Sequence, residues 1–176
     1  MEQRITGQLK GIYRDIVKNG DGGIIHDSGW TSNTIVECCR ILLAGFIRNE
    51  PSDGIRHMAF GQGLDAWDDG GPPPPDSMAT GLVTPYNPPI AFTDLSVVYL
   101  NEGLSEVATP TSRLQITAIL EPGYPTPLAP LTTYPLREFG LFGRLGGTDF
   151  MINSIRHAVI HKDTSATLIR MIRLFF

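Results

Sequence analysis

One stretch of this chain constrains its fold more than any other, the run SATLIRMIRLFF at residues 165–176. As an extended strand it carries apolar side chains on both faces, so we expect a sheet or a partner subunit to bury it. Arg170 and Arg173 have opposite parity and place one guanidinium on each face, which suits a subunit interface. An ordinary central strand with two snorkelling arginines explains the pattern equally well.

Length and composition favour one domain whose surface is largely covered by partner subunits. A chain of 176 residues can form a hydrophobic core without disulfide or metal staples. Its 14 basic and 18 acidic residues give a net charge of -4 and no concentrated basic face, so we expect no nucleic-acid partner. Because 41% of the residues are apolar and only 18% are charged, partner subunits are expected to cover much of the surface.

The two cysteines, Cys38 and Cys39, are neighbours. This spacing favours neither a structural disulfide nor a metal site, and we interpret both as buried thiols in a reducing compartment. A strained vicinal redox disulfide is the rarer alternative. The sequence shows no signal-peptide core and no apolar run of membrane-spanning length, so we expect a soluble protein made in the cytoplasm, without a membrane partner.

The first third of the chain predicts a β-hairpin followed by a helix. Residues 5–30 form the hairpin, because Asn-Gly and Asp-Gly at 19–22 supply the positive φ that a tight turn needs. Apolar residues then recur at helical spacing over about 33–48, with Ser32 or Asn33 as the N-cap. The apolar stripe is wide enough to lie buried on a sheet.

The remainder of the chain predicts strands. The clearest signal is 112–120, where Leu114, Ile116, Ala118 and Leu120 alternate with polar residues. We expect a strand at 90–100 to pair with it, and the last third to form a three-stranded meander. The predicted fold is mainly β with one α-helix, an antiparallel β-sandwich or curved sheet with long proline-rich loops. The predicted strands are 55–60, 90–100, 112–120, 136–145, 151–161 and 165–176.

Two proline-rich segments, 64–89 and 122–135, interrupt the strands. Four consecutive prolines at 72–75 hold the first segment extended, and neither segment can join a sheet along its length. We expect both to be arms that reach adjacent subunits. In the first arm Trp67, Asp68 and Asp69 form a possible ligand or receptor loop, and calcium is a minor alternative because the acidic residues lack calcium-loop spacing.

No motif for catalysis or metal binding emerges. On a strand, His157 and His161 would lie roughly 13 Å apart, too far to share one zinc ion. No nucleophile elbow surrounds any serine, and thiols inside a helix would be hidden. Glu138 is an isolated carboxylate for which a buried salt bridge with Arg137 or Arg170 is the expected use. We therefore predict a protein that is not an enzyme, with no catalytic residue, no metal and no cofactor.

Two sequence stretches resemble a known family. Leu136-Arg-Glu-Phe-Gly-Leu-Phe-Gly143, followed by a strand and a terminal strand with an aromatic pair, resembles the glutamate-φ-glycine-φ-φ strand of tail-fibre and collar proteins of tailed bacteriophages. The run 29–36, with its helix and a strand leading into Gly61-Gln-Gly63, is similar too. The long proline loop and the short length depart from this family, since they leave no room for a fibre shaft or receptor-binding tip.

The resemblance implies a virion protein, made in the host cytoplasm, that acts as a tail, baseplate or fibre-adaptor subunit of a bacteriophage or contractile injection system. Its expected partners are copies of itself and other virion or injection-machine subunits. A capsid decoration or cement protein is one alternative, and a carbohydrate-binding β-sandwich module using Trp67, Tyr86 and Tyr124 is another. The residues expected at assembly interfaces are Arg137, Glu138, Phe139, Arg170, Arg173, Phe175 and Phe176.

Overall fold

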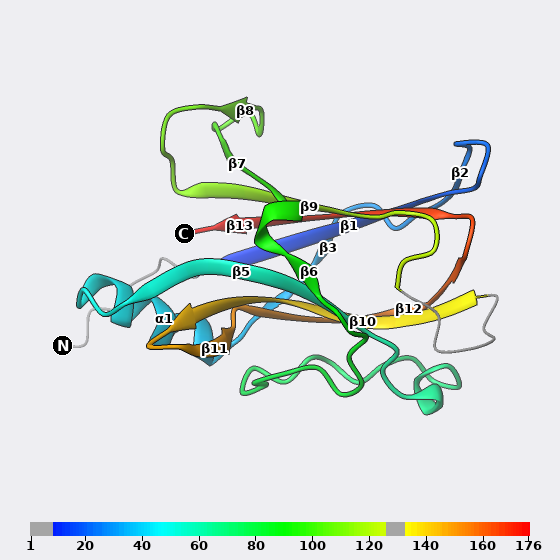
Figure 1. The fold of residues 1–176 in the computed structure, drawn as a ribbon, viewed down its shortest axis with the longest axis horizontal. Helices are drawn as coiled ribbons and strands as arrows, with labels where there is room; N and C mark the ends of the chain where they lie inside the picture. The colour runs from blue at the N-terminus through cyan, green and yellow to red at the C-terminus, as the bar shows by residue number, and fades with distance from the viewer. Residues whose placement is uncertain (1–8, 126–132) are drawn as a thin grey trace.

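The protein is a sandwich of two antiparallel sheets with one α-helix at one end (Figure 1). The structure is a computed structural model that describes residues 9–125 and 133–176. The apolar cluster between the sheets draws on both of them, so these residues share one core. The predicted fold class, mainly β with one helix and an antiparallel sandwich, is confirmed.

The first sheet has its longest strands at its centre. β13 lies between β1 and β9, and β2 and β8 lie at the two edges. β1 and β2 pair antiparallel, which confirms the hairpin over the described part of 5–30. The strands of this sheet are β1 (Lys10–Lys18), β2 (Ile24–Asp27), β3 (Thr31–Ser32), β7 (Ser96–Leu100), β8 (Glu106–Val107), β9 (Arg113–Leu120) and β13 (Thr167–Phe175).

The second sheet is built around its longest strand, β10, which pairs with β5 on one side and with β11 and β12 on the other. β4 and β6 are short edge strands. The strands are β4 (Thr34–Ile35), β5 (Ser52–Gly61), β6 (Ile90–Ala91), β10 (Thr133–Leu145), β11 (Thr148–Met151) and β12 (Asn153–Asp163).

The predicted meander is wrong in its last strand. β10 pairs with β12 as predicted and also with the short β11 between them, but β13 crosses to the first sheet and pairs with β1 and β9. Every second β13 residue is buried, from Leu168 to Leu174, and the others are half-buried. A strand with two apolar faces gains more by lying at the centre of a sheet, between two long neighbours, than at the edge of a meander.

The helix α1 (Glu37–Ile47) begins later than predicted. Residues 34–35 form β4, which pairs with β12, so their backbone groups form hydrogen bonds within the sheet. Val36 is therefore the N-cap, and it makes no side-chain cap hydrogen bond. Cys39, Leu42 and Gly45 form the buried stripe. Phe46 and Ile47 are 67% and 83% exposed, so the predicted stripe is buried only in part.

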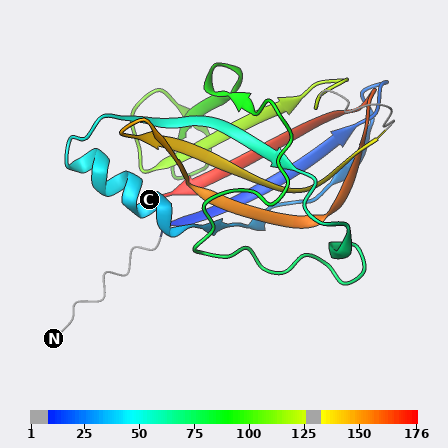
Figure 2. The same ribbon diagram turned by 60° about the horizontal axis from the view of Figure 1, so that its bottom comes forward.

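Two glycines let α1 approach the sheet. A Cβ on Gly143 of β10 would come within 2.4 Å of Leu42, and a Cβ on Gly45 of the helix would come within 2.6 Å of Leu145. The missing side chains therefore leave room for helix and strand to pack in direct contact. Figure 2 shows α1 at one end of the sandwich.

The strand predicted at 90–100 is broken. Residues 90–91 form β6 in the second sheet, the 3-10 turn η2 (Phe92–Asp94) follows, and only β7 belongs to the first sheet. This segment therefore carries the chain from one sheet to the other. β7 pairs with β9 as expected, and in β9 the inward residues Ile116, Ala118 and Leu120 are fully buried.

The segment 64–89 lies along the outer side of the chain's own second sheet (Figures 1 and 2). It begins with the 3-10 turn η1 (Asp65–Trp67), and Ala79 and Leu82 pack on a small apolar cluster. In the second predicted arm, 122–135, residues 133–135 belong to β10, and residues 126–132 lie outside the described part of the chain. A contact of either segment with another subunit remains a prediction.

Candidate functional site

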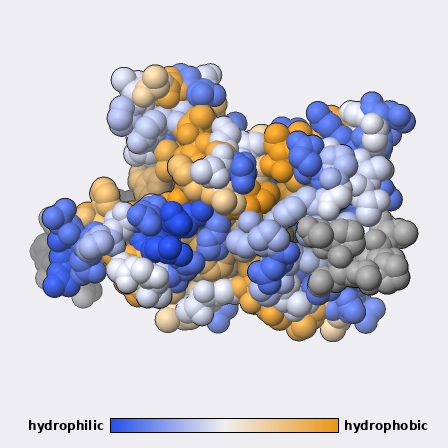
Figure 3. Space-filling view, in the orientation of Figure 1, coloured by the Kyte–Doolittle hydropathy of each residue, from blue (hydrophilic) through white to orange (hydrophobic). Residues whose placement is uncertain are grey.

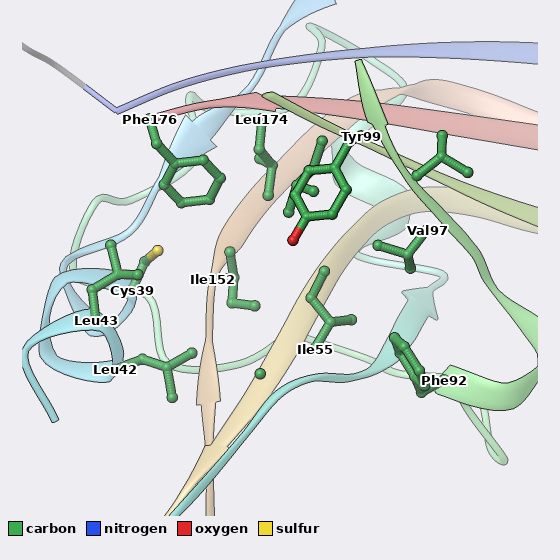
Figure 4. Close-up of a pocket in the computed structure, with 13 residues that line it drawn as sticks. Cys39, Leu42, Leu43, Ile55, Phe92, Val97, Tyr99, Ile152, Leu174 and Phe176 are labelled. Carbon is green, nitrogen blue, oxygen red and sulfur yellow. The ribbon is translucent and has the colours of Figure 1, made fainter. Parts of the chain in front are cut away.

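An apolar pocket of about 400 Å³ lies between the two sheets at the end that carries α1 (Figure 4). Both sheets, the helix and the last residue of the chain contribute to it. Its lining residues are Cys39, Leu42, Leu43, Gly54, Ile55, Phe92, Val97, Val98, Tyr99, Leu114, Ile152, Leu174 and Phe176.

The pocket forms where side chains do not fill the space between the two sheets. α1 supports one wall with Leu42 and Leu43, while β7 forms the opposite wall with Val97 and Tyr99. Gly54 has φ +50° and contributes no side chain to fill the space. A core layer between two sheets is normally filled by interdigitating side chains, so this end of the sandwich is left open.

The lining of the pocket carries no charged side chain. Its polar groups are the Tyr99 hydroxyl and the Cys39 thiol, and Figure 4 shows both among the apolar side chains. Burial raises the pKa of Cys39 to about 11. The thiol therefore stays protonated at neutral pH and is a poor nucleophile. The pocket suits an uncharged, apolar occupant.

The mouth of the pocket is aromatic. Phe92, Tyr99 and Phe176 line it and are 47%, 36% and 51% exposed. The exposed Phe46 and Ile47 of α1 lie one turn beyond the pocket residue Leu43. Hydrophobic residues also show on the face of the molecule drawn in Figure 3. Exposed large apolar side chains around an open apolar hollow indicate a surface for a partner.

A buried ion pair lies deeper between the sheets. Arg170 of β13 donates to both carboxylate oxygens of Asp15 on β1, at 2.6 and 2.8 Å, and both side chains are almost fully buried. The guanidinium also lies 3.4 Å from the Phe139 ring centroid and 2.9 Å from Nε2 of His157. Burial and the Arg170 charge lower the pKa of His157 to about 4, so the imidazole is neutral at physiological pH.

Two charged residues of β10 hold the segment 64–89 against the sheet. Arg137 donates to both carboxylate oxygens of Asp68, at 2.8 and 2.6 Å. Glu138 accepts hydrogen bonds from the backbone N–H groups of Val83 and Thr84, at 3.0 and 2.8 Å. The predicted Glu138 salt bridge with Arg137 or Arg170 is therefore wrong, because loop backbone amides satisfy this carboxylate.

The predicted receptor loop is less open than expected. Trp67 is only 7% exposed, and the guanidinium of Arg156 lies 5.0 Å from its ring centroid. Asp68 is engaged by Arg137, and the Arg137 hydrogen bond lowers the pKa of Asp68. Asp69 remains exposed. A receptor-binding Trp67 would be exposed, whereas this indole is buried and anchors the loop, because a large apolar ring gains most from burial.

The seven predicted interface residues separate into two groups. Four of them are buried inside the chain and have partners there: Arg137, Glu138, Phe139 and Arg170. These side chains are not at the surface. Arg173, Phe175 and Phe176 are at least partly accessible and remain interface candidates. Arg173 donates to Gln115 and stacks on Trp30, with its guanidinium 4.1 Å from the ring centroid.

The sequence interpretation missed the pocket and the buried Lys162. The Lys162 ammonium is inaccessible, donates to the Glu121 carbonyl at 3.0 Å, and has a pKa lowered to about 8 by burial. No sequence signal marks it. No sequence signal marks the pocket either, because its lining residues come from segments that are far apart in the chain.

Within residues 9–125 and 133–176, no group of three or more His, Cys, Asp or Glu side chains could hold a metal ion. None of the helices in the same part of the chain has the length and hydropathy needed to cross a bilayer. Comparison with protein-family models, curated proteins and solved structures gives no match to this chain.

Proposed function

We propose that the protein is a non-enzymatic structural subunit that assembles with other proteins in a bacteriophage tail, baseplate or fibre adaptor. The observation that carries the assembly role is the open apolar end of the sandwich, where Phe92, Tyr99 and Phe176 surround a pocket lined by no charged side chain. The phage setting rests on the resemblance of residues 136–143 to tail-fibre and collar strands. The proposed location is the virion, after synthesis in the host cytoplasm.

The apolar end favours a permanent partner over a transient one. A partner that covers the aromatic mouth and the exposed Phe46 and Ile47 removes these large apolar side chains from water. Such burial is typical of obligate assemblies, whose interfaces resemble a domain core. The same surface would promote aggregation in a protein that worked alone at high concentration.

Among the alternatives, a capsid decoration or cement protein shares the same requirement for apolar contacts. The carbohydrate-binding module is disfavoured. It needs solvent-exposed aromatic platforms, whereas Trp67 and Tyr86 are only 7% and 5% exposed, and the Tyr124 hydroxyl donates to the Pro88 carbonyl.

Immunoelectron microscopy tests the proposed function. An antibody raised against the purified protein is expected to label one fixed position on phage or injection-machine particles, and labelling of the head instead would select the decoration protein. Particles that carry no label, from lysates in which the protein is present in free form, would overturn the proposal.

A further inference from the structure

The composition predicted no concentrated basic face, but the outer face of the first sheet gathers positive charge in an otherwise acidic chain. Its central strands β1, β13 and β9 point five cationic side chains outward and no carboxylate. Asp27 of the neighbouring β2 pairs with Arg14 at the edge of this face. The other four cations have no carboxylate partner within the described residues. They are Lys10, Lys18, Arg113 and Arg173.

The same face has an apolar centre. Ile16, Ile169 and Ile119 are direct cross-strand neighbours in one row, and Ile119 is 48% exposed. Met171 lies in the adjacent row and is only half-buried. Burial and the nearby Arg14 lower the pKa of Arg173, so like charges already crowd this face. A docked surface with carboxylates would relieve that repulsion and cover the isoleucine row.

The segment 64–89 on the opposite side of the sandwich has the complementary character. It contains four aspartates and no lysine or arginine. Arg137 pairs with Asp68 and, at 3.1 Å, with Asp65, whose side chain is nevertheless 96% exposed. Asp69 and Asp76 are exposed and pair with no cationic side chain in the described residues. The same segment exposes apolar side chains: Leu64 is 48%, Met78 66% and Val83 46% exposed.

We propose that the basic outer face of the first sheet docks onto the acidic segment 64–89 of a second copy of this chain. Charge and apolar character match on both sides of this contact, which deepens the proposed function and rests on it. The two surfaces lie on opposite faces of one sandwich (Figures 1 and 2). The contact is therefore head-to-tail, and repetition produces a ring or a stack of subunits.

Charge reversal on each surface tests the contact. The face variant carries Lys10→Glu and Arg113→Glu, and the loop variant carries Asp69→Lys and Asp76→Lys. Light scattering over a concentration series measures the association constant at about 0.05 M and about 0.5 M NaCl, where screening differs strongly. We expect the wild-type chain to associate more weakly at high salt, and each variant alone to lose about tenfold or more in association at low salt.

An equimolar mixture of the two variants provides the decisive measurement. In the mixture, the unchanged acidic segment 64–89 of the face variant meets the unchanged basic face of the loop variant. The new lysines of the loop variant meet the new glutamates of the face variant, so association is expected to return. Matched controls place the same charge changes elsewhere, as Arg40→Glu with Arg56→Glu and as Glu102→Lys with Glu106→Lys, all at exposed positions that line neither surface. These controls are expected to associate like the wild type, and circular dichroism checks that every variant is folded.

A wild-type chain that stays monomeric at low salt, variants that associate normally, or a mixture that fails to restore association would each overturn this contact. Antibody labelling of particles together with any of these results would leave the structural function standing and remove only the copy-to-copy contact. If particles carry no label but the mixture restores association, the copy-to-copy contact would stand. The proposed structural function in a phage particle would then be overturned.

Discussion

At the scale of single residues, every charged side chain that is buried within residues 9–125 and 133–176 has a hydrogen-bond partner there. Arg170 would carry an uncompensated charge between the sheets without Asp15, and Asp15 would do the same without Arg170. The register places them directly opposite on β13 and β1. The guanidinium also lies on the face of the Phe139 ring, which adds a favourable cation–π contact.

Replacing Arg170 with methionine tests this pair. The Arg170→Met variant leaves the Asp15 carboxylate buried and unpaired, so we expect the free energy of unfolding to fall by about 3–5 kcal/mol in urea denaturation. The double variant Asp15→Leu with Arg170→Met should recover much of this loss, because no charge remains. Arg14→Met on the neighbouring strand β1 removes the exposed pair with Asp27 and should lower the free energy of unfolding much less. Equal losses in the single and double variants would contradict the interpretation.

His157 predicts how stability depends on pH. Its pKa is about 4 in the folded chain, below the ordinary histidine value of about 6.5 in the unfolded chain. The unfolded state therefore binds more protons between these values, and stability is lost as pH falls from about 6.5 to about 4, by at most roughly 3 kcal/mol.

Urea unfolding measured across this pH range checks the prediction. His157→Gln should flatten the curve in that window, whereas His161→Gln, at an exposed position of the same strand, should leave the shape unchanged. An unchanged slope in His157→Gln would show that other groups cause the pH dependence.

At the scale of elements, the position of α1 depends on missing side chains. Gly143 leaves room for Leu42, and a Cβ there would also lie 2.5 Å from the Gly54 carbonyl oxygen. Backbone of β5 and a helix side chain would thus both have to move. The helix in turn supports one wall of the pocket, so its seating determines the shape of the candidate site.

The Gly143→Ala variant is expected to lower the free energy of unfolding by roughly 1–3 kcal/mol through overpacking. Hydrogen exchange should show faster exchange in α1 than in the wild type. Gly81→Ala is the matched control, since no atom lies within 4 Å of its added Cβ and its φ is not positive. A similar effect of both substitutions would rule out helix seating as the cause.

At the scale of the whole molecule, the end of the chain joins the core to the candidate site. Phe175 lies between Lys10 and Arg113 in the register of the first sheet, and the Phe176 N–H donates to the Ser112 carbonyl. The Phe176 ring lines the pocket mouth and is half exposed. These two residues therefore contribute both to folding and to the apolar surface proposed for assembly.

Deleting Phe175 and Phe176 is expected to abolish assembly and to lower stability by about 2–4 kcal/mol, because the end of β13 and the Phe176 ring at the pocket mouth are lost. Phe176→Ala should weaken assembly with a smaller loss of stability, since this ring is half exposed in the isolated chain. Light scattering and thermal unfolding separate the two effects. Normal assembly of the truncated chain would show that this end is not part of the interface.

The sequence by itself determined the longer strands, the helix and the hairpin, because these follow from local periodicity and turn residues. The alternation of Leu114, Ile116, Ala118 and Leu120 is one example. Only the tertiary structure decided which sheet β13 joins, which carboxylates meet Arg137 and Arg170, and where the pocket lies. Asp15 and Arg170 are separated by 155 positions, and periodicity carries no information about such long-range pairing. Their meeting depends on how strands from opposite ends of the chain align, and that alignment is fixed by packing of the whole core.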